Sequence, residues 1–275
     1  MELPARSPLW LATILLLVAV ELLWRLRTRR GYDGRAAMAT LGLALGNIPF
    51  GLLNGTIVGG VASGAALLAP VQWPIHSPWS WAGGFLLFEF SYYWFHRASH
   101  RVGWMWATHS VHHSAGQLTL LASLRLGWTN GISLGWLFYV PMLLMGCPPL
   151  MLAALRAFDL RYQFLLHTEA IGRLGPLEWV LNTPAHHRVH HASNPAYLDR
   201  NYGGVLIIFD RLFGTFAAER ADEPLRYGLA GHAPGHNPLR IAFGQWGRML
   251  RAAARARGLR GRLAVLAGPP AAERE

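Results

Sequence analysis

Long apolar stretches without a charged side chain dominate the pattern along this chain. No Asp, Glu, Lys or Arg occurs between residues 36 and 88, and none occurs between residues 126 and 155. A soluble protein needs charge on its surface, whereas a bilayer-spanning helix needs about 20 consecutive apolar residues. The pattern therefore predicts an all-α integral membrane protein with about four transmembrane helices.

The N-terminal apolar residues divide into candidate spans. Residues 8–24, PLWLATILLLVAVELLW, end at a run of arginines. They lack a basic leader and a small-residue cleavage site, so we expect a retained anchor helix and not a removed signal peptide. A second span runs from about Ala37 to Asn54. Residues 57–72 are apolar but rich in small side chains, which fits a third span, a re-entrant segment or a lumenal turn.

Two further apolar segments frame the polar part of the chain. Residues 79–95, WSWAGGFLLFEFSYYWF, form a span with the aromatic side chains typical of a membrane interface, and it runs directly into His96. Residues 130–155 predict an apolar hairpin, broken at residues 146–149, GCPP, because proline interrupts a helix and glycine permits a turn. Its return arm leads to His167.

We interpret the whole chain, 1–275, as one membrane domain with three regions. The N-terminal spans occupy residues 8–75 and a histidine-rich region occupies residues 80–220. A basic tail, residues 238–266, mixes arginines with apolar side chains, which suits an amphipathic helix at the membrane interface.

Composition supports a membrane protein and restricts its chemistry. The chain is 52% hydrophobic and only 14% charged, with a net charge of +11 and a pI of about 10.9. Its basic residues lie beside apolar segments, as the positive-inside rule describes, and no nucleic-acid-binding motif is present, so nucleic acid is not the expected partner. Cys147 is the only cysteine, which leaves nitrogen and oxygen as metal ligands.

Most of the 13 histidines lie in three groups with helical spacing. The groups are HRASH with His96 and His100, HSVHH with His109, His112 and His113, and HRVHH with His187, His190 and His191, which His186 precedes. Residues three and four apart share one face of a helix, so each group presents its imidazoles together. Single pairs of this kind are often incidental, but three groups in one short chain indicate a metal site.

The third group carries its own helix boundaries. Asn182 or Thr183 can cap the helix with Pro184 at its first position, and the Asn194-Pro195 pair ends it. This pattern predicts a short helix of about three turns that holds the imidazoles on a rigid face.

Eight clustered imidazoles exceed what one zinc ion takes, and they suit two metal ions with open positions. Imidazole ligands are compatible with iron, zinc and copper. His167 follows the return arm of the hairpin, where it is a further ligand or a hydrogen-bonded core histidine; we favour the ligand. His186 either joins the cluster or turns away from it.

The segments YYWFHRASHRVGWMWATHSVHH and NTPAHHRVHHASNPAYLDRNYGGVLIIFDRLFGTF resemble the signature regions of the fatty acid hydroxylase/sterol desaturase superfamily, in particular its alkylglycerol monooxygenase-like bacterial branch. The resemblance covers roughly residues 80–220. It implies a non-haem di-iron centre that uses O2 to hydroxylate or desaturate a lipid C–H bond, with a membrane lipid as substrate and a separate protein or reductant as electron donor. The arginines after the first span and the histidine regions should share the cytoplasmic side. We therefore expect a protein of the bacterial inner membrane with its metal site in a helical cap facing the cytoplasm.

Carried over by motif, the implied iron ligands are His96, His100, His109, His112, His113, His167, His187, His190 and His191. Relatives with two histidines four apart in the region of His167 would need one at position 171, where this chain has Ile171. His186 is the candidate to replace that missing ligand.

Four polar residues are candidates for the layer around the ligands: Glu89, Arg97, Arg188 and Asn194. A carboxylate in an aromatic span is costly without a partner, so we expect Glu89 to accept the free N–H of a ligand imidazole. Arg97 and Arg188 adjoin ligands, and either dock an acidic electron donor or remain solvated near phospholipid head groups.

Two other classes of function compete with a lipid oxidoreductase. A metal transporter also places histidines in membranes, but the neighbouring arginines would repel cations and no acidic residues line a route. A zinc-stapled scaffold would need fewer imidazoles than this chain supplies.

Overall fold

The computed structural model describes residues 8–270, and in this part of the chain all regular secondary structure is helical. The α-helices are α1 (Pro8–Arg27), α2 (Gly34–Leu67), α3 (Pro78–Arg101), α4 (Gly103–His113), α5 (Val140–Leu144), α6 (Pro149–Leu166), α7 (Pro184–His191), α8 (Ile208–Leu212), α9 (Pro238–Arg255) and α10 (Gly258–Ala267). Short 3-10 helices are η2 (Leu121–Leu124), η3 (Gly135–Tyr139), η4 (Gly175–Trp179) and η5 (Pro195–Tyr197).

The helices α1 and α2 are long and apolar enough to cross a membrane, and large apolar side chains such as Leu16 and Leu45 are exposed on them. The helix α2 corrects one sequence expectation. A single helix of 34 residues replaces the predicted span ending at Asn54 and the separate segment after it. Pro49 lies inside this helix, as membrane helices tolerate.

The predicted hairpin of residues 130–155 is present only in part. Its break is confirmed, because α5 ends at Leu144 and α6 begins at Pro149. Its first arm consists of the short helices η3 and α5, which together cover Gly135–Leu144. At 1.5 Å per residue this arm is about 15 Å long, too short to cross a bilayer.

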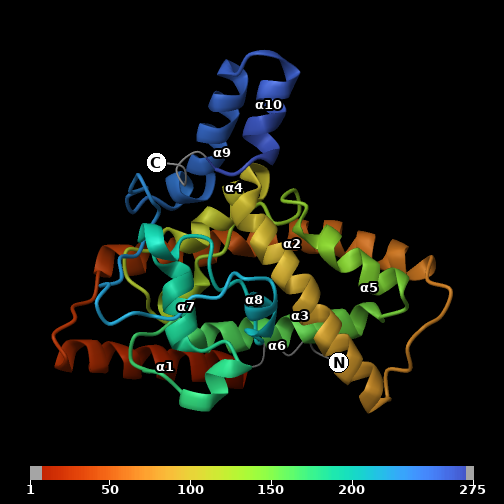
Figure 1. Cartoon of the computed structure of the whole chain (residues 1–275), viewed down its shortest axis with the longest axis horizontal. Helices are drawn as coiled ribbons and strands as arrows, with labels where there is room; N and C mark the ends of the chain where they lie inside the picture. Colours follow the sequence, from red (N-terminus) through yellow and green to blue (C-terminus); the bar gives the residue numbers. More distant parts are fainter. Residues whose placement is uncertain (1–7, 271–275) are drawn as a thin grey trace.

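Helices α3 and α4 connect the apolar layer to the polar part of the molecule. In Figure 1 α3 rises diagonally past α6 to reach α4, which adjoins the α9–α10 hairpin. Phe88, Tyr92, Met142, Met151 and Leu155 pack between α3, α5 and α6. This packing fixes the end of α3 that carries His96.

The basic tail forms two helices, and α9 uses its apolar face inside the protein. Trp246 and Met249 pack against Ala107 of α4, while Ile241 and Ala242 join a cluster with residues of α2. Part of the apolar face of α9 therefore packs against α4, a helix that carries histidines, and against α2.

Candidate metal centre

Nine of the predicted histidines come together in two clusters, each with its ring nitrogens within 4.8 Å of one another. The five-histidine cluster contains His96, His100, His109, His113 and His190. The four-histidine cluster contains His112, His167, His187 and His191. The chain thus folds three short motifs and one separate histidine, spread over 96 positions of sequence, into two adjacent groups.

Two short helices contribute to both clusters. On α4, His109 and His113 are four residues apart and enter the five-histidine cluster, while His112 lies between them in sequence and enters the other. On α7, His187 and His191 enter the four-histidine cluster and His190 enters the first. Helical spacing explains this division, because residues four apart share a face.

The Nε2 atoms converge within each cluster. The Nε2 of His109 lies 3.0 Å from that of His96 and 3.2 Å from that of His113. With a metal–nitrogen distance of about 2.1 Å, two ligands at a right angle are about 3.0 Å apart and two tetrahedral ligands about 3.4 Å apart. The separations therefore suit a metal ion with a coordination number above four.

The same spacing recurs in the four-histidine cluster. The Nε2 of His167 lies 3.1 Å from that of His112 and 3.2 Å from that of His187, and the Nε2 of His191 lies 3.1 Å from that of His187. His167, for which the sequence favoured a ligand over a core residue, therefore belongs to this group.

Backbone carbonyls orient several of the rings. The Nδ1 of His96 lies 2.8 Å from the carbonyl oxygen of Tyr202, and the Nδ1 of His167 lies 2.6 Å from that of Gln163. Nδ1 of His190 likewise faces the carbonyl of Arg200 at 2.9 Å. A carbonyl only accepts, so the proton sits on Nδ1 and the Nε2 lone pair is free to bind a metal.

Burial keeps these imidazoles neutral. It lowers the pKa of His112 to about 4 and that of His190 to about 3, because removal from water disfavours the charged ring. Neutral imidazole is the form that binds metals. The Nε2 atoms of His100 and His190 are buried and have no hydrogen-bond partner among the described residues. The donor set and these two nitrogens fit bound metal ions.

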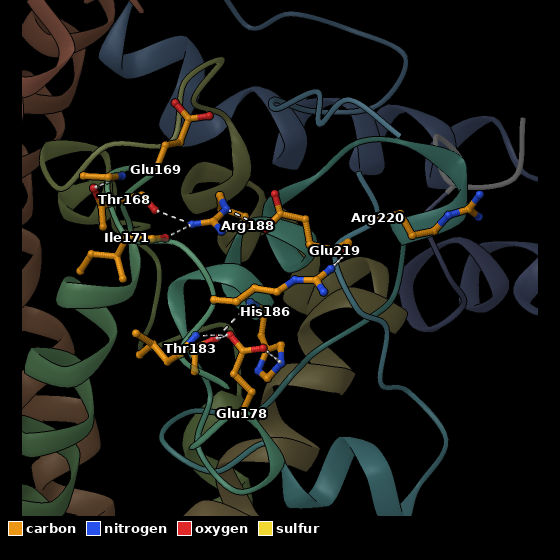
Figure 2. A network of polar contacts seen from close by, with 12 residues as sticks. Thr168, Glu169, Ile171, Glu178, Thr183, His186, Arg188, Glu219 and Arg220 are labelled. Carbon is orange, nitrogen blue, oxygen red and sulfur yellow. Dashed lines mark hydrogen bonds and ion pairs between the residues drawn. The ribbon is translucent and has the colours of Figure 1, made fainter. Parts of the chain in front are cut away.

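His186 lies outside both clusters. Its ring packs edge-on against Phe216, and its Nε2 lies 3.8 Å from a carboxylate oxygen of Glu178 (Figure 2). Although it lies four residues before His190, its ring points toward η4, where Glu178 lies, and not toward the metal clusters. Position 171 does not supply a ligand either, and the four-histidine cluster holds one imidazole fewer than its neighbour.

Arg188 ties α7 to the segment that follows His167 (Figure 2). Its guanidinium donates to the carbonyls of Thr168 and Ile171 at 3.2 and 2.6 Å, and it pairs with Glu219 at 2.7 Å. The side chain is buried, so it does not form an exposed docking charge. It positions two elements that each carry a histidine of the same cluster.

The other candidates for the surrounding layer contact backbone and side chains rather than imidazoles. Glu89 accepts from the N–H groups of Val205 and Leu206, both at 2.8 Å. This corrects the expected bond to a ligand imidazole. Glu89 precedes His96 by two turns, about 10 Å, so it holds the loop after Tyr202 instead.

Arg97 and Asn194 also turn away from the clusters. Arg97 donates to the hydroxyl of Tyr93 and covers the ring of Trp94. Asn194 donates to Glu223 and accepts from the N–H of Arg226. They hold neighbouring segments in place.

The first helix makes contacts with the site that the sequence pattern did not predict. Glu21 is buried and accepts from Thr168 Oγ1 at 2.5 Å and from the N–H of Leu120 at 2.7 Å. Arg25 pairs with Glu169 at 2.8 Å. Both charges lie near the end of an apolar span and anchor the residues just after His167.

A cavity of about 550 Å³ adjoins both clusters. His109, His112 and His167 line one part of it, and apolar residues of α1, α3, α4 and α6, including Trp10, Phe95, Met105 and Leu160, line most of the rest. Its volume falls in the range of about 300–1,000 Å³ that is usual for small-molecule sites. A long apolar molecule in this cavity would reach the histidines.

A smaller cleft reaches the five-histidine cluster from another direction. His100, His113 and His190 line it together with His232 and Gln245. His232 lies in a segment rich in glycine and proline, and only the folded chain brings it beside the cluster.

Residues 81–215 match the family described as fatty acid hydroxylase, and this segment contains all nine clustered histidines. Residues 81–215 are a fatty acid hydroxylase domain. The resemblance inferred from the histidine spacing is therefore confirmed. No solved structure matches the chain significantly.

The fatty acid hydroxylase domain also has similar proteins of known name. Alkylglycerol monooxygenase of Homo sapiens is 48% identical over 170 residues, which are 62% of this chain and 37% of the human protein. The Caenorhabditis elegans protein of that name is 39% identical over 63% of this chain and 34% of its own length. An ornithine lipid hydroxylase of Rhizobium tropici is 33% identical over 54% of this chain and 44% of its own length. The matches thus span less than half of each relative.

Proposed function

We propose that this protein is an O2-dependent, non-haem di-iron membrane oxidoreductase that hydroxylates a C–H bond of a lipid. The observation that carries the proposal is the position of two imidazole clusters beside one apolar cavity. The names of its relatives, monooxygenase and hydroxylase, favour hydroxylation over desaturation.

The donor set supports iron more than structural zinc. Nine neutral imidazoles exceed the need of one tetrahedral zinc ion, and Nε2 separations of 3.0 to 3.2 Å are close to those of ligands at right angles. Two iron ions, when bound, would supply the activation of O2. The overall reaction consumes one O2, two electrons and two protons, inserts one oxygen atom into the C–H bond and releases one water.

The residues of the chain would bind, orient and shield. The carbonyls of Tyr202, Gln163 and Arg200 fix the rings that hold the metals. Phe95, Met105 and other apolar cavity residues would keep water from the reacting carbon. The histidines at one part of the cavity would set which carbon of the lipid is presented.

The proposed surroundings follow from the same features. With α1 and α2 as candidate spans, the protein would lie in a membrane, and we propose the bacterial inner membrane with the metal site facing the cytoplasm. A lipid would enter the cavity from the bilayer. A separate electron-transfer protein or reductant would supply the electrons.

Metal content and product analysis test the proposal. Purified protein should hold about two irons per chain, consume O2 with a reductant, and give a lipid product heavier by one oxygen atom. A His187→Ala variant should lose product formation. One tightly bound zinc ion and no O2 consumption would contradict the proposal and favour a scaffold, and metal uptake into vesicles would favour a transporter.

A further inference from the structure

One arginine in the wall of the apolar cavity has no carboxylate partner. Arg156 lies on α6 and lines the cavity that adjoins His109, His112 and His167. The described residues of the cavity wall include no Asp or Glu, and Arg156 forms no ion pair with any carboxylate between residues 8 and 270.

Neighbouring polar groups do not neutralise this arginine. Asp159, one turn further along α6, feels its charge but is buried and accepts from Gln163 Nε2 at 2.6 Å. Tyr139 of η3 lies close enough to Arg156 for their side chains to contact each other, but a neutral hydroxyl cannot balance the charge of a guanidinium. Neither group forms a salt bridge with Arg156.

Arg156 is exposed, and the surface around it is apolar. Phe158 is 50% exposed and Leu160 is 43% exposed on the same helix, and Leu150 is exposed one and a half turns before. A solvent-facing helix would carry polar residues at these positions. A lipid that fills the cavity would remove Arg156 from water, and an anionic group on that lipid would offset the cost of this removal.

The position of Arg156 relative to the histidines matches a long amphiphile. Arg156 precedes His167 by eleven residues, which is about 16 Å along a helix axis. Cavity residues between them on α6 include Ala157, Leu160 and Phe164. An anionic head group at Arg156 and an alkyl chain along this apolar wall would bring a distant carbon to the histidines.

We propose that the cavity selects a lipid with an anionic head group, a phosphate or a carboxylate, and that Arg156 binds this group. The inference rests on the proposed function and deepens it by naming the chemical class of the lipid. Arg156 thereby determines specificity and contacts no reacting atom.

Binding of chain-matched probes tests this inference without any turnover. Full-length protein in a non-ionic detergent is titrated with hexadecyl phosphate, hexadecanoate, hexadecanol and inorganic phosphate. The protein should bind both anionic probes at least about tenfold more tightly than hexadecanol, the factor expected for a charge-assisted hydrogen bond. Inorganic phosphate should not displace them, because it has no chain to fill the apolar wall.

Three variants make the test specific. Arg156→Gln should bring the anionic probes to the affinity of hexadecanol, while Arg156→Lys, which keeps the charge, should retain most of the preference. Arg240→Gln removes an exposed charge of α9 outside the cavity and should change nothing. An unchanged preference in Arg156→Gln, an equal loss in Arg240→Gln, or displacement by inorganic phosphate would overturn the inference.

Metal content measured on the same samples separates this inference from the proposed function. Arg156→Gln should keep the metal content of the unmodified protein, since Arg156 contacts no clustered histidine. If the probes bind as expected but no lipid is ever oxidised, the proposed function fails and the lipid class stands. If Arg156→Gln does not fold, the ratio between anionic and neutral probes in Arg156→Lys and in the unmodified protein decides.

Discussion

The Nε2 of His167, at the end of α6, lies 3.1 Å from the Nε2 of His112 on α4. These residues are 55 positions apart in sequence. The contact joins the segment after the apolar hairpin to the second histidine motif, so His167 is an equal member of the four-histidine cluster. This relationship leads to the first prediction.

His167→Ala should lower the metal content from about two ions to about one per chain, because it removes one of four donors from the smaller cluster and none from the larger. Elemental analysis of purified protein measures this. His186→Ala is the matched control and should keep both ions, since its ring faces Glu178 and Phe216. Equal metal loss in both variants would contradict the assignment.

Removal of metal by a chelator should proceed in two steps. The four-histidine cluster offers fewer imidazoles and adjoins the cavity through His112 and His167, so its ion should leave first. Metal retained against dialysis time measures the steps. In His191→Ala the fast step should disappear, whereas in His100→Ala the slow step should become faster. A single step in the unmodified protein and in both variants would argue against two unequal sites.

Arg188→Met should destabilise the protein by about 2 kcal/mol, because the carbonyls of Thr168 and Ile171 lose a buried charged donor. Thermal unfolding in detergent gives the change in stability. The variant should also release metal from the four-histidine cluster, since His167 and His187 are no longer held together. Glu219→Gln keeps an acceptor for Arg188 and should have a smaller effect. A larger effect of Glu219→Gln would show that the ion pair, and not the hydrogen bonds to the two carbonyls, accounts for the stability.

Glu89→Ala should cost about 2 kcal/mol, because two buried N–H groups, of Val205 and Leu206, lose their acceptor. Glu89→Gln keeps one oxygen at that place and should cost much less. Unfolding temperatures of the two variants provide the comparison. If Glu89→Gln is as unstable as Glu89→Ala, the negative charge is required and the hydrogen bonds alone do not explain the role of Glu89.

The sequence predicted the local parts of the site well, because helical spacing and capping act over a few residues. Thr183 does cap α7, with Pro184 as its first residue, and the three histidine motifs do present their rings together. The sequence could not distinguish His186 from His187, since both are adjacent on one short helix. Only the packing of η4 against α7 turns the first ring away.

Contacts between distant segments could not be predicted from the sequence, because helical spacing and capping act over only a few residues. The partners of Glu89 are backbone groups 116 and 117 residues away. Almost every residue has a backbone N–H group, so the sequence does not indicate which of them Glu89 binds. The length of α2 was also missed. Small residues after Asn54 suggested a break, but α2 continues through them to Leu67 and also contains Pro49.

The packing of α9 against α4 has a consequence for the boundaries of the working unit. Every clustered histidine precedes residue 192, so a chain ending at residue 237 would still contain the full ligand set. It would nevertheless uncover Ala107 on the helix that carries His109, because Trp246 and Met249 would be gone. Such a shortened protein should lose metal despite having every donor, because the C-terminal segment supports a helix of the metal centre without supplying a ligand to it.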